Sequence, residues 1–189
     1  MVTYNIKDQA TAMSGYYRDI QDLLEAVEND NTDIVARIFE YGNVELLLKW
    51  RDPVSKYNLL HKAAESGAFG VTEFLCDEHN IPIGEHDVES RTAIHIACKQ
   101  LHGEDYSQNK DYDDWFYYSE TNHYKIAEYL VARAVKTYNA TDSTHPLNKK
   151  ESNGLSILQM AYEYDLPELS QIARQGLEPA YDSDQEHTN

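Results

Sequence analysis

Two pairs of side chains in this 189-residue sequence have the types and spacing of metal ligands. Cys76 and His79 are three residues apart and Cys98 and His102 are four apart, so on a helix each pair would share one face. Two ligands do not complete a tetrahedral site, and the sequence has no C-x-x-C or H-E-x-x-H motif to supply the others. We therefore predict no metal site and no cofactor.

Adjacent carboxylates could perform general acid and base catalysis, and Asp113 and Asp114 form such a pair. They lie in a segment without helical or strand periodicity, whereas catalysis requires side chains held on a rigid frame. The sequence also lacks a glycine-rich phosphate loop and a G-x-S-x-G motif. These observations predict that the protein is not an enzyme.

Aromatic and acidic side chains are concentrated between residues 102 and 123. Aromatic rings offer large contact areas and accept cations on their faces, while carboxylates attract a basic partner over a distance. Together they favour binding of a protein rich in Arg and Lys. The predicted partner-binding residues are Tyr106, Asp111, Tyr112, Asp113, Asp114, Trp115, Phe116, Tyr117 and Tyr118.

The whole chain is acidic, with a formal charge of -17 and a pI near 4.7. Such a field repels phosphate backbones and anionic lipids, so we expect no direct binding to nucleic acid or membranes. The mean hydropathy of -0.67 leaves no room for an apolar run of about 20 residues. The chain shows no secretory signal and has only two cysteines, which predicts a cytoplasmic protein with reduced thiols.

The sequence contains an internal repeat, which predicts the helices that position the side chains described above. The segments "NLLHKAAESG", from residue 58, and "RTAIHIACKQ", from residue 91, share a Leu/Ile-His-x-Ala core, and His61 and His95 are 34 positions apart. Small residues after each His would let paired helices approach closely, and Ile, Leu and Phe at helical spacing form an apolar stripe downstream. One helix pair cannot bury that stripe, but stacked pairs can.

These segments resemble the ankyrin-repeat family, whose repeat of about 33 residues forms a turn and two antiparallel helices. The resemblance implies an all-α solenoid and structural roles for His61 and His95, whose rings would bond to backbone in the neighbouring turn. Degenerate repeats flank the two clear ones, with Gln159 in place of His in the last. The first of the two clear repeats matches the family pattern at Leu60, His61, Ala63, Ala64, Gly67, Val71, Phe74 and Leu75, and the second at Thr92, Ala93, Ile94, His95, Ala97, Cys98, Ile126, Tyr129 and Leu130.

The spacing inside the third repeat places the acidic aromatic segment. His61 precedes Val71 by 10 residues, whereas His95 precedes the equivalent Ile126 by 31, an excess of 21. We predict repeats at about 20–51, 52–86, 87–137 and 150–176, with an insertion at 101–121 that leaves the stack between two helices. Residues 1–19 would form an N-terminal flank and residues 177–189 an acidic, disordered tail.

Three functions remain open from the sequence alone. The first is a monomeric protein-interaction module that inhibits or recruits a basic protein, acting in the cytoplasm or, for a secreted bacterial effector, in a host cytosol. The second is a nucleic-acid mimic or immunity-type inhibitor, because a charge of -17 is comparable with that of a short duplex. The third is a scaffold in which Trp115 and Phe116 of the insertion pack on the repeats.

Overall fold

The computed structural model describes residues 18–103, 121–139, 141–142 and 145–177. Within them the chain forms helix pairs in sequence order. The first pair consists of a helix at 18–28 and α2 (Thr32–Tyr41), and the short helix α3 (Val44–Leu48) follows it. The second pair is α4 (Leu59–Ser66) and α5 (Phe69–Asp77), and the third is α6 (Ala93–Gly103) and α8 (Asn122–Thr137). The fourth pair is α9 (Ile157–Glu163) and α10 (Pro167–Leu177). A 3-10 helix, η2 (Pro146–Asn148), precedes the last pair.

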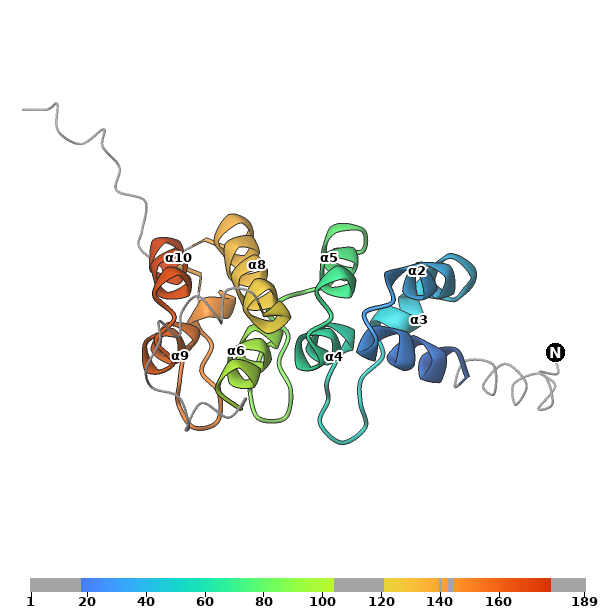
Figure 1. The fold of residues 1–189 in the computed structure, drawn as a ribbon, viewed down its shortest axis with the longest axis horizontal. Coiled ribbons are helices and arrows are strands. Elements are labelled where there is room, and N and C mark those ends of the chain that lie inside the picture. The colour runs from blue at the N-terminus through green and yellow to red at the C-terminus, as the bar shows by residue number, and fades with distance from the viewer. Residues whose placement is uncertain (1–17, 104–120, 140, 143–144, 178–189) are drawn as a thin grey trace, which may run out of the picture.

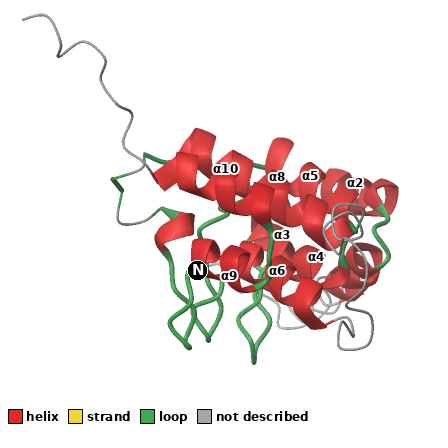
Figure 2. Ribbon diagram, turned by 60° about the vertical axis from the view of Figure 1, so that its left-hand side comes forward, coloured by secondary structure: helices red, strands yellow, loops and turns green. Residues whose placement is uncertain are grey.

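The helix pairs stack into two layers (Figure 1). One layer contains α4, α6 and α9, and the other contains α2, α5, α8 and α10, with neighbours in contact along each row. The turns that connect one pair to the next project together from one side (Figure 2). This arrangement confirms the predicted all-α solenoid with an ankyrin-type order of turn, first helix and second helix.

The first helices of the second and fourth repeats each begin at a residue that caps them. In α4 and α9 the caps are Asn58 and Ser156, and each forms a reciprocal capping box with the third helical residue. His61 Nδ1 accepts from the Asn58 N–H at 3.4 Å, and Gln159 Oε1 accepts from the Ser156 N–H at 3.0 Å. The replacement of His by Gln in the last repeat therefore keeps the capping bond, because both side chains present an acceptor there.

The core lies between the two layers and matches the predicted residue types. Ala63, Ala97 and Ala161 are buried at the crossing of the paired helices, where a small side chain permits close approach. The second helices contribute larger apolar side chains that are fully buried, namely Val71, Leu75, Ile126 and Leu130. Burial of each such side chain stabilises the fold by about 1.5 to 3 kcal/mol.

Contacts between repeats complete the ends of helices that cannot cap themselves. Ala68 provides no side-chain cap for α5, but Asp30 of the preceding pair accepts from the N–H groups of Gly70 and Val71, at 3.2 and 2.9 Å. At the other end of α5, the Arg133 guanidinium donates to the Cys76 carbonyl. Each repeat thus needs its neighbour for its own hydrogen bonds, not only for apolar burial.

The third repeat is interrupted between its two helices. Helix α6 runs to Gly103, so it includes residues 101–103, which the sequence analysis assigned to the insertion. Helix α8 starts after Thr121, whose hydroxyl accepts from the Tyr124 N–H. Residues 104–120 lie outside the described residues. No helix in the described part of the chain is long and apolar enough to cross a membrane.

Candidate interaction surface

The predicted partner-binding residues fall outside the part of the chain that the structure describes. Tyr106, Asp111, Tyr112, Asp113, Asp114, Trp115, Phe116, Tyr117 and Tyr118 all belong to residues 104–120. The described helices fix only where this segment is attached, which is the carboxyl end of α6 and the amino end of α8. The predicted binding role of these residues therefore remains a prediction.

The turns between repeats form the most regular surface of the described molecule. The Val88 N–H donates to the Ser55 carbonyl at 3.1 Å, and the Ser152 N–H donates to the Glu89 carbonyl at 2.8 Å. The residue three positions before the start of each first helix has a positive φ in all three turns. The value is 63° at Lys56, 62° at Ser90 and 90° at Gly154. The turns therefore share a positive φ at this position and are bonded edge to edge, which makes a rigid row of turn tips.

Two valines stand exposed on that row. The exposed fraction is 83% for Val54 and 61% for Val88, and each follows an aspartate that folds the turn. The Asp52 carboxylate accepts from the N–H groups of Val54 and Ser55, so the turn conformation holds the valine outward. Sequence analysis missed these valines, although their common spacing from the repeated caps at Asn58 and Thr92 was visible in the sequence.

A polar network fixes the middle turn beneath its tip. Asp87 Oδ1 accepts from the Glu89 and Arg91 N–H groups, both at 2.8 Å, and its Oδ2 accepts from Arg91 Nε at 2.7 Å. Arg91 also donates to the Tyr57 hydroxyl of the preceding turn at 3.1 Å. Burial alone would raise the pKa of Asp87, but the hydrogen bonds and charge of Arg91 hold it below its ordinary value.

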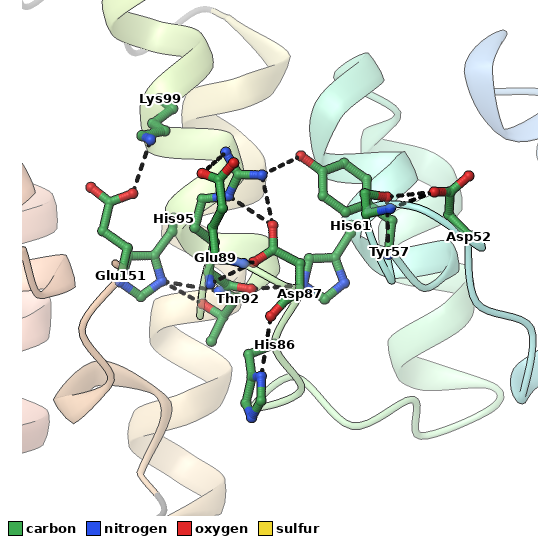
Figure 3. A network of polar contacts seen from close by, with 12 residues as sticks. Asp52, Tyr57, His61, His86, Asp87, Glu89, Thr92, His95, Lys99 and Glu151 are labelled. Carbon is green, nitrogen blue, oxygen red and sulfur yellow. Dashed lines mark hydrogen bonds and ion pairs between the residues drawn. The ribbon is translucent and has the colours of Figure 1, made fainter. Parts of the chain in front are cut away.

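The histidines of the two clear repeats are buried next to these turns (Figure 3), as predicted. His61 Nε2 donates to the Arg91 carbonyl in the following turn at 3.0 Å, which confirms its expected bond to a neighbouring backbone. His95 accepts from the Thr92 N–H through Nδ1 at 3.2 Å. Its Nε2 forms no hydrogen bond of normal geometry, although the carbonyls of Leu155 and Lys149 lie on that side. The bond expected for His95 is therefore incomplete.

Burial sets the protonation of both rings. It lowers the pKa of His61, against the opposing effect of the Arg91 carbonyl, and lowers the pKa of His95 to about 4. Both rings are neutral at pH 7, so a neutral ring can accept at Nδ1 and donate at Nε2. They are structural groups with no access to a substrate.

The turn at the start of the fourth repeat is held by different interactions from those of the preceding turn. Glu151 stands where Asp87 stands in the previous turn and is 3% exposed. Its Oε2 pairs with Lys99 of α6 at 2.9 Å, and its Oε1 has no hydrogen-bond partner. Asp52, Asp87 and Glu151 lie in one row across the three turns in Figure 3.

In the described part of the chain the structure shows the pair of Cys76 and His79, whereas the side chain of His102 is not described. No group of three or more His, Cys, Asp or Glu side chains could hold an ion there. The His79 ring packs against Phe39 and Phe74, at centroid distances of 4.4 and 4.9 Å. Burial raises the pKa of Cys76 and Cys98 to about 12, so both remain neutral thiols at pH 7.

Charge is unevenly distributed along the solenoid. Residues 18–50 carry eight Asp and Glu against three Lys and Arg, whereas residues 121–177 carry six of each. The segment 104–120 carries six acidic residues against Lys110. The acidity of the chain therefore belongs to particular regions, and the last helix pairs are electrically balanced.

A family model described as ankyrin repeats, in three copies, matches residues 23–142 of the chain. No curated protein sequence matches the chain.

Proposed function

The chain belongs to the ankyrin-repeat family, whose repeats generally mediate protein–protein interaction and typically have no enzymatic activity, and from this premise we propose that it binds and thereby inhibits or recruits a basic protein. The observation that carries the proposal is the rigid row of turn tips with exposed Val54 and Val88. Apolar side chains held outward on a bonded row are suited to burial against a partner.

The acidic aromatic segment supplies a second part of the proposed surface. It is attached to the carboxyl end of α6, whereas the turn tips precede the amino end of that helix. An 11-residue helix is roughly 16 Å long. A partner that contacts both parts would therefore span the first-helix layer, from Val88 near one edge to the point where the segment is attached at the other.

Uneven charge favours this function over mimicry of a nucleic acid. A duplex presents one charge per about 1.7 Å along its whole length. Residues 121–177 carry equal numbers of acidic and basic residues, so the described solenoid does not present a continuous row of negative charge. We propose a monomer in a reducing cytoplasm, a compartment in keeping with two free, buried thiols at Cys76 and Cys98.

The proposal is tested by site-specific photo-crosslinking of the intact protein in lysate. A crosslinker at position 88 should capture a protein rich in Lys and Arg, and one at the exposed Glu163 should not. Once that protein is purified, Val54→Ser with Val88→Ser should speed its dissociation, because apolar contact is lost. Equal capture from both positions would show that the turn tips are not a specific surface.

The segment 104–120 is tested with the same purified partner. Changing Asp111, Asp113 and Asp114 to Asn should mainly slow association and reduce its salt dependence. Changing Trp115 to Ala should speed dissociation and cost roughly 2 kcal/mol of binding free energy. The segment has no binding role if residues 104–120 can be replaced by a short Gly-Ser linker with affinity intact, and a lower melting temperature for the Trp115 variant alone would favour the scaffold.

A further inference from the structure

The first helix pair leaves an open cleft at the end of the stack. The cleft has a volume of about 650 Å³ and lies between the helix at 18–28 and α2. The first helix lines it with three carboxylates, those of Asp19, Asp22 and Glu25. Helix α2 lines it with three larger side chains, those of Ile34, Ile38 and Tyr41.

The α2 side of this cleft is a surface that every other repeat covers. Ile34 occupies the position that Val71, Ile126 and Leu169 occupy in the following second helices. Those three side chains are fully buried, whereas Ile34 is 42% exposed. Tyr41, one turn beyond Ile38, is 81% exposed. The cleft therefore presents the face on which a helix packs elsewhere in this molecule.

Charged residues replace apolar ones at two positions of the same face. Asp22 stands where Leu59, Ala93 and Ile157 are buried in the later repeats. Arg37 stands where Phe74 contacts Phe39 of the preceding repeat, at 5.6 Å between ring centroids. An apolar stripe with a charged border is a binding surface for an amphipathic partner, not the uniform apolar face of a missing repeat.

The border of the cleft is negative and its charges are available. Residues 18–50 have a formal charge of -5, from eight acidic and three basic residues. Asp19, Asp22 and Glu25 are exposed, and within the described part of the chain none of them forms an ion pair. Spaced three residues apart, they repeat about every 4.5 Å along the helix axis. Ile34, Ile38 and Tyr41 recur at helical spacing on the opposite wall.

We propose that this cleft binds an amphipathic helix of a partner protein, with Lys or Arg along one edge and aliphatic side chains along the other. The aliphatic side chains contact Ile34, Ile38 and Tyr41, and the cations pair with Asp19, Asp22 and Glu25. A helix is the occupant because helices cover the equivalent face in each later repeat, and a basic one because the border is negative. This site is separate from the turn tips and does not depend on their function.

The probe is a synthetic peptide of about 18 residues, long enough to be helical in water, with Leu on one face and Lys along its flank. Its binding to the full-length protein is followed by NMR through the backbone amides and the Ile34 methyl groups. We expect the largest shift changes at Ile34, Ile38 and Tyr41, and broadening of the Ile34 signals by a spin label on the peptide. Broadening centred anywhere else would overturn the proposal, without requiring any variant.

A matched pair of variants measures the contribution of the cleft. Asp22→Lys with Ile34→Ser should weaken peptide binding by roughly tenfold or more, since it removes an apolar contact and reverses one charge. Leu46→Ser with Glu163→Lys makes a comparable chemical change at exposed positions outside the cleft and outside the turn tips, and should leave the affinity unchanged. If both variants lost the same affinity, or if a peptide of scrambled sequence bound equally well, binding would depend on net charge alone. Either result would overturn the proposal.

Two other occupants give different results. If residues 1–17 of the chain cover the cleft, the free protein shows nuclear Overhauser contacts between those residues and Ile34, and the peptide does not bind. If a second copy covers it, sedimentation shows a concentration-dependent dimer that Ile34→Ser abolishes. Either result overturns the partner-helix proposal and leaves the function of the turn tips untouched.

Discussion

The turn before α6 and the turn before α9 occupy equivalent places in the solenoid but are held by different bonds. In the first, Asp87 accepts from two backbone N–H groups of its own turn and pairs with Arg91. In the second, Glu151 reaches Lys99 on another helix, and the turn is bonded by Asn153, whose side chain accepts from the Leu155 N–H. One turn thus relies on a local network around Arg91, whereas the other, with Leu155 in place of Arg91, relies on a contact between repeats.

The two histidines show the same difference. His61 donates to the carbonyl of Arg91 in the turn that Asp87 organises, whereas His95 Nε2 faces the turn of Glu151 without a hydrogen bond. The junction of the second and third repeats therefore has a histidine hydrogen bond that the next junction lacks, although Asn58 Nδ2 beside His61 is buried and unpaired. The next junction leaves two buried polar atoms, His95 Nε2 and Glu151 Oε1, unpaired. We call the junction of the second and third repeats the first junction, and that of the third and fourth repeats the second junction. We expect the stability of the first junction to be more sensitive to mutation, and that of the second to be more sensitive to pH.

Asp87→Ala should have the largest effect, lowering the free energy of unfolding by about 3 to 4 kcal/mol. The change removes a fully buried carboxylate, leaves Arg91 with the half-exposed Glu89 as its ionic partner and frees two backbone N–H groups. Chemical denaturation at pH 7 measures it. Asp87→Asn is the control, because it retains an acceptor and should cost less; equal losses would show that the hydrogen bonds to Oδ1 contribute little.

Acid should weaken the second junction by about 3 kcal/mol. The pKa of His95 is about 4 in the folded chain and about 6.5 when unfolded, so the unfolded state binds the proton more readily. Its contribution is present in full above pH 6.5 and is lost as the pH falls through 4. Unfolding free energies between pH 7 and pH 4 measure the loss.

His95→Gln is the matched control for that titration, since Gln159 makes the same capping bond in the fourth repeat. The variant should show a flatter pH dependence than the natural chain, while His61→Gln should flatten it less. If the wild-type and His95→Gln profiles run parallel, His95 does not account for the acid sensitivity.

His61→Ala should lower the free energy of unfolding by about 2 kcal/mol. His95→Ala should cause a smaller loss, of about 1 kcal/mol. Both variants lose a buried ring and its capping bond, but only His61 also loses a bond to the next turn. Thermal melts of the two variants, compared with the unmodified protein, test the difference. A larger loss for His95→Ala would reverse the comparison of the two junctions.

Glu151→Gln should have the smallest effect, within about 1 kcal/mol in either direction. The change removes an ion pair with Lys99, whose side chain is 34% exposed and can return its charge to water, and it also removes a buried, half-bonded carboxylate. Urea denaturation measures it. A loss comparable with that of Asp87→Ala would mean that the long-range pair stabilises its turn as strongly as the local network.

Much of the candidate surface could not be predicted from the sequence. The acidic aromatic segment attracted attention because its composition is unusual, and its residues lie outside the described structure. Val54 and Val88 attracted none, although both lie four residues before a cap, because the spacing of a valine in a polar turn does not show whether its side chain is exposed. Their exposure follows from the turn conformation and from the bond between the Ser55 carbonyl and the Val88 N–H, which joins two repeats.

The sequence by itself determined the repeat, its helix pairs and the burial of His61 and His95. These features depend on interactions within a few residues, such as the capping boxes at Asn58 and Ser156, and on an apolar period that only stacking can bury.

The tertiary structure alone decided which residues join one repeat to another. Asp30 caps α5, Glu151 reaches Lys99, and Ile34 stays exposed where its equivalents are covered. These outcomes depend on the distance and rotation between stacked helix pairs, which bring together residues about 40 to 50 positions apart. No local pattern encodes that geometry, because it arises from the packing of the whole stack.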